Sequence, residues 1–186
     1  MVDFYHMVFA LSIFLGTLSI INKILLFIEK KSGWLSGIAI GLISGFYFWI
    51  IDLKILSISE AGFFLVMLYG YIRHTHPSLK ETLKFNLILS ALSLLLCYFL
   101  FVGLITFIET ISALSFIWGG YFLAINKKTF GWLLFLLAHT TTAFTSFYVE
   151  QVIFSILQLI SGLICIYAIL FPIHYKLRNF NKIIQN

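Results

Sequence analysis

Long apolar runs separated by short polar joints make up most of the chain. Seven runs reach or approach the roughly 20 apolar residues that a membrane-spanning helix needs. They cover residues 4–28, 33–51, 55–72, 85–108, 111–125, 130–149 and 152–173. The joints are tight, except for a longer polar connection at 73–84. The pattern therefore predicts an all-α membrane protein with seven transmembrane helices.

The composition supports this prediction. Of the 186 residues, 61% are hydrophobic and 10% are charged, whereas ordinary domains are roughly half apolar and a quarter charged. We therefore expect the lipid bilayer as a partner. A net charge of +5 does not indicate a nucleic-acid partner, because most of it lies in the joints. Cys97 and Cys165 lie in apolar runs without metal or disulfide spacing. No nucleophile, metal or phosphate-loop motif favours an enzyme or a cofactor.

The charged residues predict the orientation in the membrane. With seven spans, ten of the twelve Lys and Arg residues fall on one side, namely Lys30, Lys31, Arg73, Lys80, Lys84, Lys127, Lys128, Lys176, Arg178 and Lys182. The acids Asp3, Asp52, Glu109 and Glu150 fall on the other side. The positive-inside rule then predicts a multi-pass protein of the cell (inner or plasma) membrane. Its N-terminus is outside, as part of a retained first helix, and its tail at 174–186 is cytoplasmic.

An internal repeat appears when the chain is shifted by 98 residues, which aligns 33–69 with 131–167. Among the matches, Trp34 falls on Trp132, Asp52 on Glu150, Glu60 on Gln158 and Tyr69 on Tyr167. We expect a single transmembrane domain of two three-helix units, at about 4–73 and 111–173, joined by a linker helix at about 85–108. Three spans and a linker reverse the chain so that both units face the same way, as in parallel-repeat transporters. Such units would enclose a shared central cavity.

The polar residues inside the runs are the candidates for lining this cavity. Glu60 lies about five residues into its span, roughly 8 Å deep, and an intramembrane acid is usually functional. The alternative is an acid near the interface that reaches water. Gln158 lies at matching depth, where its alternative role is an interhelical hydrogen bond. His139 and Thr142 belong to the most polar stretch of any span. The alternative there is packing, with threonines bonded to their own helix.

Aromatic residues extend the candidate site. Trp34 and Trp132 each begin a span on the Lys-rich side, where aromatic belts lie. From the pattern we expect a belt position for Trp34 and also for Trp132, whose alternative role is stacking on a planar substrate. Tyr69 could line the same cavity or pack in the core. Lys23, in the first span, is expected to extend toward the cytoplasm.

The stretch 28–71 resembles the first half of the PnuC family, which transports nicotinamide riboside and related vitamin precursors. The matching features are Glu29-Lys30, Gly37, Gly45, Leu53, Phe63-Phe64 and Tyr69-Gly70, with Trp132-Leu133-Leu134 in the second half. The resemblance implies a homotrimeric facilitator that works by alternating access and releases its small-molecule substrate to cytoplasmic kinases. The chain departs from the family at Glu60 in place of Gln, His139 in place of Asn and Tyr71 in place of Trp.

The departure at Glu60 bears on the substrate. A carboxylate favours a cation, and both nicotinamide riboside and thiamine are cations. The expected arrangement of three helices, a linker helix and three further helices is shared with the sugar-transporting SWEET proteins, so a sugar transporter is an alternative. A channel or a non-transporting membrane partner is the other alternative.

Overall fold

The structure, a computed structural model, describes residues 2–76 and 83–171 of the chain. This part contains seven α-helices and no strand. The helices are α1 (Val2–Phe27), α2 (Lys31–Ile50), α3 (Lys54–Thr75), α4 (Leu83–Phe99), α5 (Leu104–Ala124), α6 (Lys128–Tyr148) and α7 (Val152–Leu170). The predicted all-α class is therefore confirmed. The predicted cytoplasmic tail at 174–186 lies outside the described residues.

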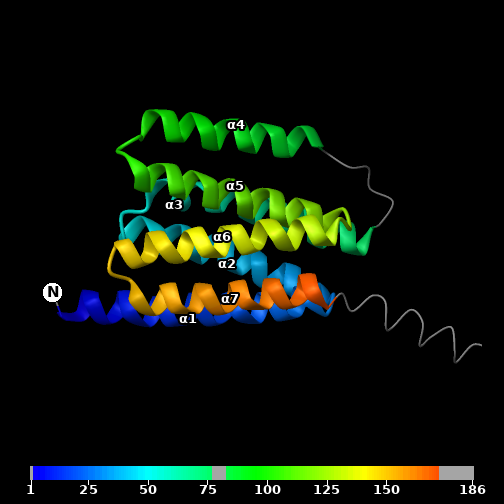
Figure 1. The fold of residues 1–186 in the computed structure, drawn as a ribbon, viewed down its shortest axis with the longest axis horizontal. Coiled ribbons are helices and arrows are strands. Elements are labelled where there is room, and N and C mark those ends of the chain that lie inside the picture. The colour runs from blue at the N-terminus through cyan, green and yellow to red at the C-terminus, as the bar shows by residue number, and fades with distance from the viewer. Residues whose placement is uncertain (1, 77–82, 172–186) are drawn as a thin grey trace, which may run out of the picture.

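Six of the helices are long and apolar enough to cross a membrane. The exception is α4, whose 17 residues fall just short. At 1.5 Å per residue it is about 26 Å long, compared with a hydrocarbon core of about 30 Å. In Figure 1, α4 nevertheless runs alongside α5 in the opposite direction, so that successive helices alternate in direction. The six long helices indicate a multi-pass membrane protein.

The helices other than α4 form a closed ring. In the first half of the chain, α1 packs on α2 and α2 packs on α3. In the second half, α5 packs on α6 and α6 packs on α7. The ring closes where α3 packs on α5 and α1 packs on α7. Helix α4 lies outside the ring and contacts α5 and α3 (Figure 1). The interior of the ring is thus bounded by six helices, three from each half of the chain.

The same tight turn joins the helices at four places. Its central residue has a positive φ between 58° and 62°, and is Glu29, Asp52, Asn126 or Glu150. At each turn the next residue donates a backbone hydrogen bond to the carbonyl five residues back, as Lys30 does to Leu25 and Lys127 does to Phe122. This is the Schellman arrangement, which satisfies carbonyls at the end of a helix. It brings consecutive helices side by side in opposite directions.

One predicted boundary is wrong. The sequence placed the joint between the fourth and fifth spans near Glu109, but the chain turns at 100–103, where Gly103 has a φ of 137°. Glu109 instead lies inside α5 and is only 4% exposed. Its carboxylate accepts hydrogen bonds from the N–H groups of Ile55 and Leu56, at 3.0 and 3.2 Å. Because this partner lies far away in sequence, the acid is satisfied without reaching water.

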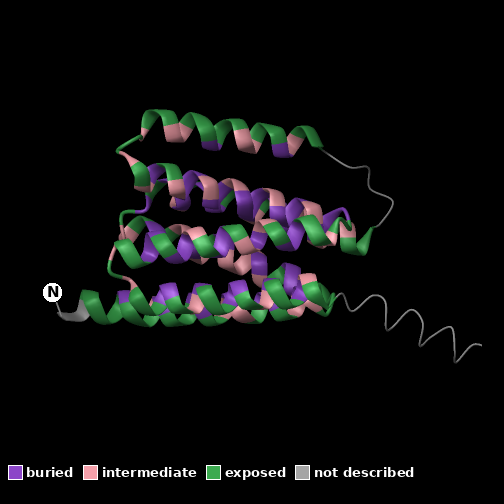
Figure 2. Ribbon diagram, viewed as in Figure 1, coloured by how far each residue is buried: buried purple, intermediate pink, exposed green. Residues whose placement is uncertain are grey.

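Apolar side chains face outward and many polar ones face inward. Figure 2 shows buried residues on the inner sides of the helices and exposed ones on the outside. Large apolar residues such as Leu42, Trp49 and Leu163 are more than half exposed. In contrast, Asn22, Ser112 and Ser161 have no exposed surface. This distribution fits an outer surface that contacts lipid and an interior that holds polar groups.

Candidate functional site: a central polar cavity

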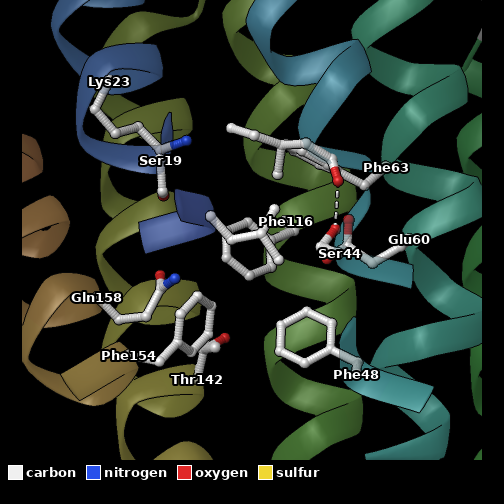
Figure 3. A pocket seen from close by; sticks show the side chains of 12 residues that line it. Ser19, Lys23, Ser44, Phe48, Glu60, Phe63, Phe116, Thr142, Phe154 and Gln158 are labelled. Atoms are coloured by element: carbon white, nitrogen blue, oxygen red, sulfur yellow. Dashed lines mark hydrogen bonds between the residues drawn. The ribbon is translucent and has the colours of Figure 1, made fainter. Parts of the chain in front are cut away.

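A small cavity lies inside the ring, between the two halves of the chain (Figure 3). Its polar lining consists of Ser19, Lys23, Ser44, Glu60, Thr142 and Gln158. Four aromatic rings complete much of the wall, from Phe48, Phe63, Phe116 and Phe154. The cavity volume is about 20 Å³, which is room for about one water molecule. The site is therefore collapsed in this conformation.

Residues related by the 98-residue shift meet in this cavity. Glu60 and Gln158 both line it, and so do Ser44 and Thr142, which are also 98 positions apart. A hydrogen bond recurs with the same shift next to them. Ser57 Oγ donates to the Gly45 carbonyl at 2.6 Å, and Ser155 Oγ donates to the Ala143 carbonyl at 2.8 Å. The α2–α3 and α6–α7 pairs thus present corresponding positions to one site.

Glu60 lies deep inside the protein rather than at a wet interface. It is 5% exposed, and its Oε2 atom has no hydrogen-bond partner among the described residues. In Figure 3 its carboxyl group lies beside the hydroxyl of Ser44. That hydroxyl donates to the Ile40 carbonyl at 2.6 Å. One carboxyl oxygen of Glu60 is therefore left for a group that enters the cavity.

His139 contacts Gln158, one of the residues that line the cavity. Its Nδ1 atom lies 2.6 Å from Gln158 Oε1, and the residue is only 1% exposed. The ring packs edge-on against Phe116, with centroids 5.2 Å apart. It does not line the cavity in this conformation, although the sequence suggested a lining position. With its Oε1 atom engaged by the imidazole, Gln158 can offer its NH₂ group as a donor toward the cavity.

Thr142 lines the cavity and ties α6 to α5. Its hydroxyl lies 2.5 Å from that of Ser112, which also donates to the Ala138 carbonyl at 3.1 Å. Neither Thr142 nor Ser112 has exposed surface. The predicted candidates Glu60, Gln158 and Thr142 are therefore brought together, with His139 in contact with one of them.

Lys23 was overlooked as a site residue by reasoning from sequence. It does not extend toward the cytoplasm, because it is 1% exposed and lines the cavity. Its Nζ donates to Asn22 Oδ1 at 2.7 Å and lies 4.2 Å from the centre of the Phe135 ring. The rule that selected Glu60, that a charge inside a span is functional by default, would also have selected Lys23.

Three other aromatic candidates lie away from the cavity. Trp132 is buried and packs edge-on against Phe135, with centroids 6.1 Å apart. Trp34 is also buried, so its expected belt position is wrong. Tyr69 stacks on Tyr121 at 6.2 Å and accepts a hydrogen bond from Arg73 at 2.9 Å. All three belong to the packing between the cavity and the Lys-rich end.

The cavity is closed toward both ends of the ring. Toward the Lys-rich end, Lys128 forms an ion pair with Glu29, and His74 Nε2 lies 3.3 Å from the Glu29 carbonyl. Toward the other end, the rings of Tyr47 and Phe154 pack with centroids 4.8 Å apart. The Lys128–Glu29 and Tyr47–Phe154 contacts join segments from both halves of the chain.

Comparison of the chain with models of protein families, with curated proteins and with solved structures gives no match. Among the described residues, no group of three or more His, Cys, Asp and Glu side chains could hold a metal ion. The site must therefore be interpreted from its own geometry.

Proposed function

We propose that the chain is a membrane transporter that carries a small aromatic vitamin precursor by facilitated diffusion and alternating access. Nicotinamide riboside is the first candidate substrate, and a related B vitamin such as thiamine is the next. The main support is the central cavity, in which Glu60 meets Gln158 and Ser44 meets Thr142. Polar groups that gather at the junction of two repeats, inside an apolar shell, are typical of transporter substrate sites.

The proposal includes the repeat architecture. Helices α1–α3 and α5–α7 are taken as two parallel units, and α4 as the linker outside them. The recurring Ser57–Gly45 and Ser155–Ala143 hydrogen bonds support this assignment. So do the two closing contacts of the ring, since α3 on α5 and α1 on α7 are exchanged by the same symmetry. Rocking of one unit against the other would open the cavity to either side.

The chemistry of the lining supports an aromatic substrate. Four phenylalanine rings surround the polar groups, and aromatic faces attract flat and cationic rings. Glu60 supplies a hydrogen-bond acceptor, and the Gln158 amide supplies a donor. The PnuC resemblance adds a homotrimer in the cell membrane, with the Lys-rich end in the cytoplasm, as part of the same proposal.

A thermal-shift screen of the purified protein against vitamins, nucleosides and neutral sugars is the first test. A ligand that binds the folded state at a hundred times its Kd adds about 2.7 kcal/mol of stability. We expect a vitamin or nucleoside with a flat ring to raise the Tm, and Glu60→Ala to abolish the shift. A shift by sugars alone would favour the SWEET-like alternative.

Uptake of labelled substrates into proteoliposomes then tests transport itself. We expect downhill entry of the stabilising ligand without ATP or an ion gradient, and none in vesicles without protein. The proposal fails if no compound of the panel stabilises the protein or enters the vesicles, and if Glu60→Ala behaves like the parent.

A further inference from the structure

Two opposite charges line the central cavity without forming an ion pair. Lys23 enters from α1 and Glu60 from α3, and they approach the cavity from opposite sides in Figure 3. Within the described part of the chain, neither takes part in a salt bridge at 4.0 Å or less. Both are nearly fully buried, at 1% and 5% exposure. The cavity therefore separates the two charges.

Neutral groups hold the ammonium of Lys23 in place. One of its donors is used on Asn22 Oδ1, and the Phe135 ring lies beneath it. Asn22 is fixed in turn, because its Nδ2 atom donates to the Gly33 carbonyl at 2.6 Å and to Ser36 Oγ at 3.1 Å. An ammonium has three donors, so Lys23 can still bind an acceptor inside the cavity.

On the opposite wall of the cavity, Glu60 offers a hydrogen-bond acceptor. The Oε2 atom of Glu60 is buried without a hydrogen-bond partner in the described structure. A buried acceptor without a partner destabilises the folded state, and more so when it is charged. A donor or a cation from a bound molecule would satisfy it. The two walls together thus favour a molecule with an acceptor at one end and a donor at the other.

The net charge of the cavity lining also favours a substrate whose own net charge is zero. The Lys23–Glu60 pair sums to zero wherever a shared proton lies. Among the described residues, the other ionisable side chains close to this pair are His139, behind Gln158, and Cys165, which interacts electrostatically with Lys23. A bare cation would add an uncompensated charge to a cavity surrounded by an apolar shell, which is costly. A zwitterion adds none and can pair with both residues.

We propose that the cavity selects a zwitterionic form of the flat-ring substrate, with its cationic ring at Glu60 and its carboxylate at Lys23. The inference rests on the proposed transport function and narrows its substrate class, because it ranks zwitterionic vitamin precursors above the cations nicotinamide riboside and thiamine. The phenylalanines on the wall suit the cationic ring, because the faces of such rings attract positive charge. Lys23 is then a specificity-determining residue.

Two ribosides with the same ring and sugar form a matched pair of probes. Nicotinamide riboside is a cation, whereas nicotinate riboside carries an additional carboxylate and is a zwitterion. In proteoliposomes containing the unchanged protein, we expect the zwitterion to enter at least about tenfold faster, because the cation leaves Lys23 without its partner. Equal or faster entry of the cation would overturn the inference and leave the proposed transport function standing.

Variants at Lys23 test the assignment of the carboxylate subsite. We expect Lys23→Met to lose the preference, with cation uptake at least equal to that of the zwitterion. Lys54→Met is the matched control, since Lys54 is exposed and pairs with Asp52 outside the cavity. A preference that survives Lys23→Met would contradict the role of Lys23. If neither riboside enters the vesicles or raises the Tm while another vitamin of the panel does, the inference fails and the transport function stands. If no compound of the panel does either, both fail. If Lys23→Met does not fold, the two ribosides on the unchanged protein decide alone.

Discussion

Glu60 and Glu109 are both buried acids inside the bundle, but their surroundings differ. The Glu109 carboxylate accepts two backbone N–H groups in the first turn of α3, a turn whose donors have no partner within the helix. Glu60 faces the central cavity with one oxygen unpaired in the described structure. We therefore interpret Glu109 as a cap that joins α5 to α3, and Glu60 as a group available to a ligand.

Matched substitutions separate the two roles. Loss of a side-chain cap costs about 0.5–2 kcal/mol, so Glu109→Ala should lower the Tm of the purified protein and leave ligand-induced stabilisation intact. Glu60→Gln keeps the shape of the side chain but replaces the carboxyl group, so the ligand-induced shift should be lost whatever the Tm of the variant without ligand. Thermal unfolding in detergent, with and without ligand, measures both. Equal behaviour of the two variants would contradict the distinction.

The site residues differ in how far the sequence could predict them. Glu60 and Gln158 could be found because the repeat aligns two polar positions inside apolar runs. Lys23 was assigned an interfacial position because long basic side chains near a span end usually reach water. Its burial depends on Asn22 and Phe135. The second of these contacts is with a helix from the other half of the chain, which a local pattern cannot contain.

At the scale of elements, the α4–α5 boundary shows the same limit. The turn at 100–103 contains no charged residue, so the apolar run seems to continue through it. Glu109 resembles a polar joint until its partners at the start of α3 are known. The other joints contain charged residues and are predicted to within a few residues. Sequence patterns thus locate the turns that contain charged residues and miss the turn that contains none.

The packing of α2 on α3 depends on Gly70. A Cβ atom at this position would lie 2.1 Å from Cζ3 of Trp34, a buried and rigid ring. We expect Gly70→Ala to destabilise the protein by about 1–3 kcal/mol, the usual cost of overpacking a core. Thermal or denaturant unfolding of the purified variant measures this effect.

Gly162 in α7 provides the matched control. A Cβ atom there would have its nearest contact at 3.5 Å, with Leu136 Cδ1, which is ordinary van der Waals distance. We expect Gly162→Ala to be neutral or to stabilise α7 by about 0.5–1 kcal/mol, because alanine favours a helix over glycine. An equal loss of stability in both variants would contradict the prediction that close packing of Gly70 against Trp34 causes the effect.

At the scale of the whole molecule, the charged residues favour one orientation in the membrane. The turns with Lys30 and Lys127 lie at the same end of the bundle, and the turns with Asp52 and Glu150 lie at the opposite end (Figure 1). The helices alternate in direction through α4. The positive-inside rule therefore predicts that the Lys-rich end faces the cytoplasm.

Labelling of single cysteines tests this orientation. In a background with Cys97→Ser and Cys165→Ser, an impermeant maleimide added to intact cells should label Lys54→Cys and spare Lys127→Cys. Both positions are exposed at opposite ends of the bundle, so permeabilised cells should show labelling of both and serve as the control. The reverse pattern would place the Lys-rich end outside. Labelling of both positions in intact cells would contradict the expectation that α3, α4 and α5 each cross the membrane between them. Since six long helices alone fix no direction, this experiment decides which end of the central cavity faces the cytoplasm.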